Sequence, residues 1–257
     1  MGKFGEVRGV FVAGCMAAVV LAAFGVHAEE GGGEHPAWDY GDVHGPEHWA
    51  DIDPAFATCR TGMRQSPIDI SGPAARDGAA PSLALDYRAG AATVVNLGHT
   101  LQVNVAAGNR LTLGGVDYQL LQFHVHTPSE HSIDGRHSPM EAHLVHRNAD
   151  GGLAVVGVLI DAGAAGVIDE LPLPDAVGGT AELDAALDPS HLLPAARGFH
   201  AFEGSLTTPP CSEGVQWIVM RAPATASEET IARITAVLGP TNRPVHPLNG
   251  REVLTGE

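Results

Sequence analysis

Lysine is nearly absent from this chain of 257 residues, in which Lys3 is the only one. Arginine brings the basic total to 14, against 30 acidic side chains, and the formal net charge is −16. Because a nucleic-acid surface needs clustered lysine and arginine to neutralise phosphates, this composition argues against a nucleic-acid partner. Aromatic residues are also scarce at 5%, but hydrophobic residues reach 44% and charged residues only 17%. The composition therefore predicts a folded chain and excludes a disordered one.

Long hydrophobic runs are absent with one exception, at the N-terminus. A short basic start containing Lys3 precedes an apolar run over residues 9–26. Val26-His27-Ala28 then places small residues at positions −3 and −1 of a cleavage site, which is typical of a secretory signal peptide. We therefore predict a signal peptide at residues 1–28 and a periplasmic or secreted protein, with no membrane association after cleavage. The remaining residues, 29–257, are predicted to form a single domain, because no linker divides them.

Two other interpretations of the N-terminus remain open. The apolar run has about 18 residues, so it is long enough for a membrane anchor. However, Glu29-Glu30 follow it without the positive residues of a stop-transfer signal. Val12-Ala13-Gly14-Cys15 resembles a lipoprotein cleavage box, but most of the apolar run lies after Cys15. Cleavage after Ala28 is the favoured interpretation.

Cysteine is the third scarce residue, with 3 copies. Cys15 would leave with the signal peptide, so Cys59 and Cys211 would remain in the exported protein. An oxidising compartment favours a disulfide for such a pair, with two buried thiols as the alternative.

Glycine and proline are plentiful and punctuate a chain that is predicted to be mainly β. Strand follows strand without regular intervening helices, which argues against a doubly wound parallel sheet. One helix is predicted after the cap at Ser227, ending at Leu238 before Gly239-Pro240, and a shorter one over Thr180–Leu187. The predicted strands are rich in alternating or β-branched residues: Leu83–Tyr87, Thr93–Val95, Thr100–Val105, Tyr118–His126, Ala142–Arg147, Leu153–Ile160 and Val215–Arg221.

Histidine is the residue in surplus, with 14 copies. His124 and His126 are two apart on a predicted strand, so their side chains share one face. His143 on the next predicted strand would complete three nitrogens and leave one tetrahedral position open, as in a catalytic zinc site. Gln122 and Glu141 lie on the same faces and are placed to hydrogen-bond the imidazoles. A His-x-His pair alone is weak, since exposed strands carry such pairs by chance, and His146 falls on the opposite face from His143 as a structural residue.

The order of the motifs then identifies a family, because the chain closely resembles the α-class carbonic anhydrases, in particular the bacterial exported members. The resemblance runs from about Trp38 to Arg251. Its motifs are Trp38-Asp39-Tyr40-Gly41, Gly45-Pro46-Glu47-His48-Trp49, Gln65-Ser66-Pro67-Ile68, Gly98-His99, Gln122-Phe123-His124-Val125-His126, Ser129-Glu130-His131, Glu141 to His146, Gly204-Ser205-Leu206-Thr207-Thr208-Pro209-Pro210 and Asn242-Arg243-Pro244.

The resemblance implies a large, twisted, predominantly antiparallel sheet of ten strands with short peripheral helices. It also implies reversible hydration of CO2 by attack of a zinc-bound hydroxide, with His124, His126 and His143 as the Zn²⁺ ligands. Thr207 would accept the hydroxide proton and donate its own to Glu130, because a carboxylate only accepts. Taken alone, Thr207 and Glu130 would be interpreted as a turn residue and a surface acid.

The remaining site residues are also implied by the resemblance. His99 takes the proton-shuttle position, where a histidine can accept and release protons near neutral pH. Cys59 and Cys211 match the disulfide of exported relatives, and Asn242 lies beside the ligands. CO2 would meet an apolar wall, with Thr208 near the bicarbonate product, and a water network would carry the proton. The wall is Val145, Val155, Leu206 and Trp217, and the network is Tyr40, Leu97 and Gln102.

Some positions depart from the family pattern. Leu97 replaces an asparagine common in relatives, which would dry or reshape the water path. The tryptophan that often follows the second ligand is missing from His126-Thr127-Pro128. His99 and Gln102 fall on opposite faces of a regular strand, so both reach the cavity only if a bulge intervenes.

The expected ligands are CO2 and bicarbonate, with sulfonamide and anion inhibitors, and a homodimer is possible. One rival function is a zinc hydrolase, although the His-Glu-x-x-His motif is missing from the sequence. The other is a silent, carbonic-anhydrase-like binding domain, which usually lacks a ligand histidine.

Overall fold

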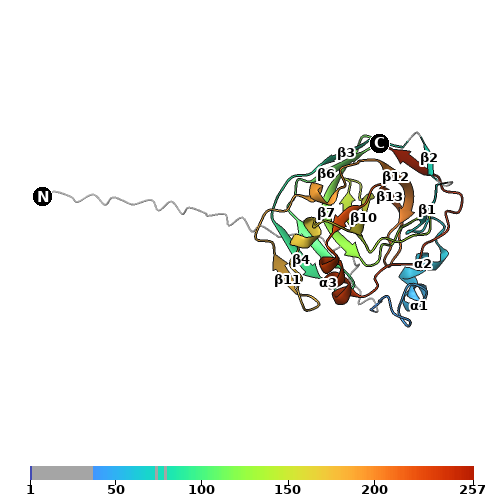
Figure 1. Ribbon diagram of the computed structural model, residues 1–257, viewed down its shortest axis with the longest axis horizontal. Helices are drawn as coiled ribbons and strands as arrows, with labels where there is room; N and C mark the ends of the chain where they lie inside the picture. The colour runs from blue at the N-terminus through green and yellow to red at the C-terminus, as the bar shows by residue number, and fades with distance from the viewer. Residues whose placement is uncertain (2–36, 73–74, 78–79) are drawn as a thin grey trace. The chain divides into compact units, whose positions relative to one another are not determined.

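Strands dominate the computed structural model, which describes Met1 and residues 37–72, 75–77 and 80–257 (Figure 1). The predicted signal peptide beyond Met1, with Cys15, lies outside the described residues. None of the described helices is long and apolar enough to cross a membrane. Residues Glu34–Glu257 fall into one unit by their contacts.

A single large sheet of 13 strands holds nearly all of the strands, and the main path through it runs β11-β4-β5-β7-β9-β10-β13-β12-β15-β2. β3 pairs with β6, β6 also with β7, and β14 with β10. β1 (Asp69–Ile70) and β8 (Ser132–Ile133) form a separate two-stranded sheet. The strands of the large sheet are β2 (Ala75–Asp77), β3 (Leu83–Asp86), β4 (Ala92–Asn96), β5 (Leu101–Val105), β6 (Arg110–Leu113), β7 (Val116–His126), β9 (Met140–Arg147), β10 (Leu153–Ala162), β11 (Thr180–Glu182), β12 (Phe199–Ser205), β13 (Glu213–Met220), β14 (Ala224–Ala226) and β15 (Val253–Gly256).

The prediction of a mainly β fold with a predominantly antiparallel sheet is confirmed, although a few pairs are parallel and the sheet has more than ten strands. β10 pairs in parallel with β13 and β14, and β15 pairs in parallel with β2, whereas the other pairs in this sheet are antiparallel. The additional strands include β2, β11 and β14, each of 3 residues. A strand of that length contains too few residues to show an alternating pattern, so the sequence could not reveal it.

Helices are short and few in the described chain. They are α1 (Trp49–Ile52), α2 (Thr58–Thr61) and α3 (Glu228–Leu238), with the 3-10 turns η1 (Pro54–Phe56), η2 (Val167–Glu170) and η3 (Pro189–Leu192). α3 is confirmed with its cap, because the Ser227 hydroxyl accepts from the Thr230 N–H at 3.2 Å and Gly239 follows with φ 66°.

The helix predicted over Thr180–Leu187 is wrong. Thr180–Glu182 forms β11, which pairs antiparallel with β4 and places Ala181 opposite Val94. Leu187 then exchanges backbone hydrogen bonds with Gly90. The free edge of β4 supplies backbone partners that a local helix preference does not outweigh.

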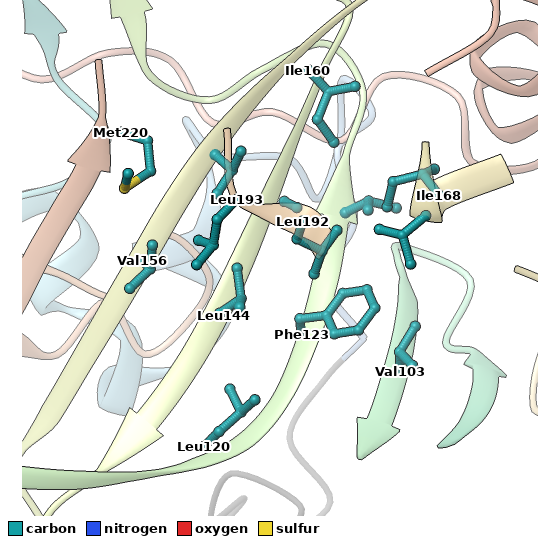
Figure 2. Packing of buried hydrophobic residues seen from close by; sticks show 14 of the residues in the cluster. Val103, Leu120, Phe123, Leu144, Val156, Ile160, Ile168, Leu192, Leu193 and Met220 are labelled. Atoms are coloured by element: carbon teal, nitrogen blue, oxygen red, sulfur yellow. The ribbon is translucent and has the colours of Figure 1, made fainter. Parts of the chain in front are cut away.

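The strand register divides the sheet into two faces. Phe123, Leu144 and Val156 lie opposite one another on β7, β9 and β10, and point into the main apolar core (Figure 2). Leu192 and Leu193, in and just after η3, pack in the same core. The next residues along the strands necessarily point to the other face, so the hydrophobic alternation of β7 places its histidines there.

Cys59 in α2 and Cys211 after β12 form a disulfide across 152 residues, as predicted. The bridge lies in a small cluster with Trp49 and Phe56, so it joins the α1–α2 region to the segment that follows Thr208. α1 and α2 lie side by side in Figure 1.

Candidate metal centre

Three imidazoles converge on the face of the sheet opposite the main core. His124 and His126 come from β7, and His143 on β9 lies directly opposite His124. Their ring centroids are 5.1, 5.3 and 4.7 Å apart, and one ring nitrogen of each lies within 4.8 Å of the other two. Strand pairing therefore brings His143 next to two histidines that precede it by 19 and 17 positions.

The outer nitrogen of each ring faces a different oxygen. His124 Nδ1 donates to Gln122 Oε1 at 2.9 Å, and His126 Nδ1 donates to a backbone carbonyl, that of Thr241, at 2.6 Å. His143 is turned the other way, with its Nε2 3.0 Å from Glu141 Oε1. Two Nε2 atoms and one Nδ1 atom therefore remain free to bind a metal ion.

The local electrostatics suit a divalent cation. Burial, together with neighbouring imidazoles, holds the pKa of His124 well below its usual value, and burial also lowers the pKa of His126. Burial opposes protonation of His143 as well, but the Glu141 carboxylate outweighs it and raises the pKa of His143. Among the described residues the buried His126 Nε2 has no hydrogen-bond partner. A metal ion would satisfy this atom, and three imidazole nitrogens with one open position match the donor set of a catalytic zinc site.

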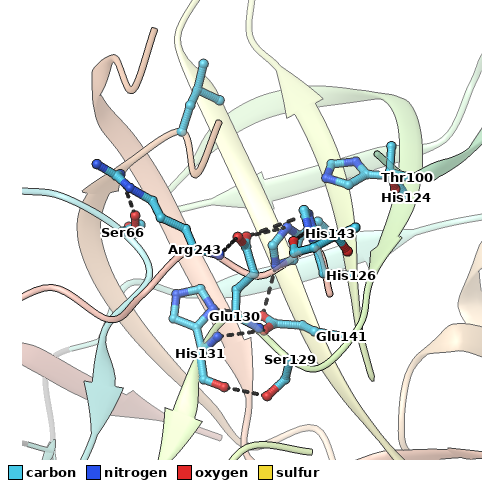
Figure 3. A network of polar contacts seen from close by, with 12 residues as sticks. Ser66, Thr100, His124, His126, Ser129, Glu130, His131, Glu141, His143 and Arg243 are labelled. Atoms are coloured by element: carbon cyan, nitrogen blue, oxygen red, sulfur yellow. Dashed lines mark hydrogen bonds and ion pairs between the residues drawn. The ribbon is translucent and has the colours of Figure 1, made fainter. Parts of the chain in front are cut away.

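Glu141 is the most heavily bonded carboxylate near the triad. It is fully buried, and its Oε2 accepts the backbone N–H groups of Glu130 and His131 at 2.9 and 2.8 Å (Figure 3). Its Oε1 lies 2.8 Å from His131 Nδ1. Burial alone would raise the pKa of Glu141, but the imidazoles of His131 and His143 hold it well below the usual value. Gly157 on β10 leaves the necessary room, since a Cβ there would lie 2.8 Å from Glu141 Oε1.

Sequence reasoning missed the roles of His131 and Thr241. His131 stands inside one of the family motifs, and its full burial next to Glu130 is not visible in the residue pattern. Thr241 contributes a backbone carbonyl, which no side-chain motif can reveal. The residue that hydrogen-bonds His126 is Thr241. Its neighbour Asn242 is the residue that the resemblance placed beside the ligands.

Glu130 lies directly behind the triad and is fully buried. Its Oε1 accepts the Arg243 N–H at 2.9 Å, while its Oε2 lies 3.6 Å from His126 Nε2 and 3.8 Å from His143 Nδ1 (Figure 3). Within the described chain Oε2 has no hydrogen-bond partner. Thr207 is 5% exposed, and its bond to Glu130 stays a prediction.

The four residues predicted as an apolar wall fall into one cluster. Val145, Val155 and Trp217 lie opposite one another on β9, β10 and β13, and Leu206 packs against the same cluster. The Trp217 ring meets His143 edge-on with centroids 4.9 Å apart. Apolar surface therefore begins next to the third imidazole. Thr208 begins a turn that ends at Cys211. The Cys211 N–H donates to the Thr208 carbonyl at 2.9 Å.

His99 lies in the turn between β4 and β5, before the regular strand begins at Leu101. His99 therefore precedes the regular strand, so the alternation of β5 does not decide where its side chain points. Its ring lies against Trp38 with centroids 4.6 Å apart, and burial together with His126 lowers the pKa of His99 to about 4. Gln102 lies opposite His124, with its amide donating to Asn104 at 2.8 Å.

The other two residues of the predicted water network occupy different surroundings. The Tyr40 hydroxyl is shielded from solvent and has no hydrogen-bond partner in the part that the structure describes. Burial, with the nearby Glu130 charge, raises the pKa of Tyr40 well above its usual value, so this hydroxyl stays protonated. Leu97 is half-buried in the His99 turn, where its N–H donates to the Thr100 carbonyl at 2.9 Å.

Comparisons with known proteins agree with this geometry. The model of the eukaryotic-type carbonic anhydrase family matches residues 44–257. A carbonic anhydrase of Pectobacterium carotovorum is 40% identical over 221 residues, covering 84% of this chain and 90% of the relative. The α-carbonic anhydrase of Thermovibrio ammonificans, solved with sulfanilamide, superimposes with a TM-score of 0.82 at 40% identity, covering 85% of this chain and 98% of that one. Dioscorin, solved with ascorbate, is 31% identical with a TM-score of 0.79 and covers 86% of this chain and 98% of that one. This chain belongs to the eukaryotic-type, or α-class, carbonic anhydrase family.

Proposed function

We propose that this carbonic anhydrase hydrates CO2 reversibly with Zn²⁺ held by His124, His126 and His143. The observation that carries the proposal is the set of three ring nitrogens within 4.8 Å, each ring oriented by its own acceptor. When bound, zinc makes hydroxide available at neutral pH, because in carbonic anhydrases generally it lowers the pKa of a coordinated water to about 7, a value that comes from those enzymes and not from this structure.

Glu130 and Thr207 would aim the attacking oxygen. Glu130 Oε1 is already occupied by the Arg243 N–H, so Oε2 is the oxygen available to the Thr207 hydroxyl. Once that hydroxyl donates to Glu130, its own oxygen can only accept. Thr207 would then accept a hydrogen bond from the attacking oxygen, which leaves a lone pair of that oxygen directed toward CO2.

The apolar cluster beside His143 would receive CO2. Val145, Leu206 and Trp217 offer no hydrogen bonds from their facing surfaces, so they favour an apolar molecule over water. Thr208, next to Thr207, would contact the bicarbonate product. Sulfonamides and anions are the expected inhibitors, as for the relative solved with sulfanilamide.

His99 would move the proton between the site and the solvent, through water ordered near Tyr40, Leu97 and Gln102. A pKa of about 4 in this arrangement makes His99 a weak proton acceptor. We therefore expect added imidazole, which is a better acceptor near neutral pH, to speed turnover in weak buffer.

A binding protein without catalysis is the second candidate, because the fold also resembles dioscorin. The complete triad and its three acceptors favour the enzyme. Purified protein should contain about one zinc per chain, measured by elemental analysis, and should hydrate CO2 in a stopped-flow assay with sulfonamide inhibition. Full-length, folded protein without zinc and without activity would sink the proposal, and His143→Ala provides the negative control.

We also propose that the chain is exported to the periplasm or secreted, with cleavage after Ala28. The Cys59–Cys211 disulfide supports an oxidising compartment. N-terminal sequencing of protein from a periplasmic extract should begin at Glu29. Light scattering of the same material would test for the possible homodimer.

A further inference from the structure

The last residue of β4 ties the His99 turn to a distant segment of the chain. Asn96 is 2% exposed, and its side chain makes two hydrogen bonds. Oδ1 accepts the Gly98 N–H at 2.8 Å, and Nδ2 donates to the Pro174 carbonyl at 2.9 Å. Its backbone bonds to the same segment, with N–H donating to the Gly179 carbonyl at 3.0 Å and the carbonyl accepting from Gly178 at 2.7 Å. One residue therefore joins the turn to residues 174–179.

The opposite end of the turn is fixed as well. The buried Thr100 hydroxyl donates to the Val125 carbonyl at 2.7 Å, and Val125 stands between two of the triad histidines on β7 (Figure 3 shows Thr100 beside His124). Gly98 has φ 83°, a conformation that glycine adopts without steric cost. A Cβ on Gly98 would lie 3.3 Å from Val177 Cγ1, so the 174–179 segment also abuts the turn. His99 is thus held between two anchors, one on each side.

We propose that Asn96 is a positioning residue for proton transfer, whose carboxamide holds the turn that presents His99 to the triad. The inference rests on the proposed shuttle role of His99. Asn96 reaches neither the triad nor the apolar cluster through any of its hydrogen bonds, so it has no direct part in the attack on CO2.

Loss of the carboxamide would free the turn in a specific way. Without it, the buried Pro174 carbonyl and the partly buried Gly98 N–H lose their partners, and each has to find water. The turn then relaxes toward solvent at its Asn96 end, while the Thr100 anchor and β7 remain. Proton transfer depends on the distance from His99 to the triad, whereas the hydration step does not involve His99.

The test compares Asn96→Ala with His99→Ala and with their double variant. Stopped-flow CO2 hydration at low buffer should show kcat reduced about tenfold in Asn96→Ala, with kcat/KM nearly unchanged. Added imidazole should restore kcat. The double variant should be little slower than His99→Ala alone, because both changes remove the same step.

Asn109→Ala is the matched control. Asn109 is also 2% exposed, donates through Nδ2 to the Ala106 carbonyl at 2.9 Å and accepts the Arg88 N–H at 2.8 Å. Its hydrogen bonds join the loop between β3 and β4 to the loop between β5 and β6, and neither loop carries a candidate site residue. Loss of Asn109 should therefore lower thermal stability without lowering kcat at low buffer. Asn96→Asp is the second variant if Asn96→Ala does not fold, because it keeps the acceptor for Gly98 but replaces the donor to Pro174 by a carboxylate oxygen that repels the Pro174 carbonyl.

Three results would overturn the inference, and they differ from one another. If kcat and kcat/KM of the Asn96 variants fall together and imidazole gives no rescue, or if neither falls, Asn96 has no part in positioning the shuttle. If His99→Ala itself keeps full turnover at low buffer, the shuttle role fails, and the inference fails with it. Zinc content and sulfonamide binding report on the rest of the proposed function independently of both.

Discussion

At the scale of single residues, the orientation of the triad depends on groups that never reach the metal position. Glu141 shows this most clearly, because its two oxygens engage two backbone N–H groups, His131 and His143 at once. A carboxylate held by so many donors stays ionised, as its low pKa indicates. That charge increases the electron density of the His143 ring and so its strength as a ligand.

We predict that Glu141→Gln weakens zinc binding about 10- to 100-fold, the usual cost of losing such a partner. The glutamine carboxamide has the volume of the glutamate carboxylate but no charge. Its NH2 group would also face N–H donors that now bond to a carboxylate oxygen. Competition with a chromogenic chelator measures the affinity. Glu203→Gln is the control, since Glu203 is a surface carboxylate paired with Arg64, and its affinity should equal that of wild type. Equal zinc affinity in Glu141→Gln would show that the contact does not tune the metal site.

At the scale of elements, the disulfide connects α2 to the segment that carries Thr207 and Thr208. Cys211 follows this pair closely, and its N–H donates to the Thr208 carbonyl. The Gln65 side chain also donates to the Cys211 carbonyl at 3.1 Å. The bridge therefore fixes the far end of the turn that presents the two threonines.

We predict that replacing both cysteines by serine lowers the free energy of unfolding by about 5 kcal/mol, the chain-entropy value for a loop of this length. The loop closes across 152 residues, so the unfolded chain gains considerable freedom when it opens. Urea unfolding at pH 7.5 measures the change. Wild-type protein treated with reductant should unfold at the same urea concentration as the double variant. A loss below about 1 kcal/mol would mean that the bridge hardly restricts the unfolded chain.

Elements differ in how well the sequence reveals them. β7, β9 and β10 are predictable because each has at least 8 residues, long enough to show which residues share a face. That periodicity places His124 and His126 on one face, and the resemblance to the family adds His143. The sequence of β11 instead favours a helix, because its strand pairing depends on the edge of β4 and not on its own residues. The Thr241 carbonyl escapes prediction for a related reason, since a backbone acceptor gains its role only from the fold.

At the scale of the whole molecule, the negative charge does not explain the function. Bicarbonate is itself an anion, so a formal charge of −16 would repel it. Under the proposed function, attraction comes from the charge of the bound zinc, which the low polarity of the site strengthens. The histidine surplus has a consequence for the entire fold, however, because several of these residues are buried in the neutral form and must be protonated in acid.

His146 gives the clearest case. It is fully buried on the face opposite the triad, where the Tyr87 hydroxyl lies 2.8 Å from its Nε2. Burial lowers the pKa of His146 to about 4. Between pH 6.5 and 4 the unfolded chain therefore binds this proton and the folded chain does not, so stability falls as the pH falls. The loss from this one residue amounts to about 3 kcal/mol over that interval.

We therefore predict that His146→Gln reduces the acid sensitivity of the metal-free protein. The variant should be less stable than wild type at pH 7.5, because the ring and its contact with Tyr87 are lost, yet it should lose about 3 kcal/mol less between pH 6.5 and 4. Urea unfolding at several pH values, with zinc removed by chelation, measures how the free energy of unfolding of each protein changes with pH. Tyr87→Phe is the control, since it lowers stability but leaves His146 buried, and should keep the wild-type slope. Identical slopes for wild type and His146→Gln would mean that His146 is protonated equally in the folded and unfolded chains, contrary to its burial.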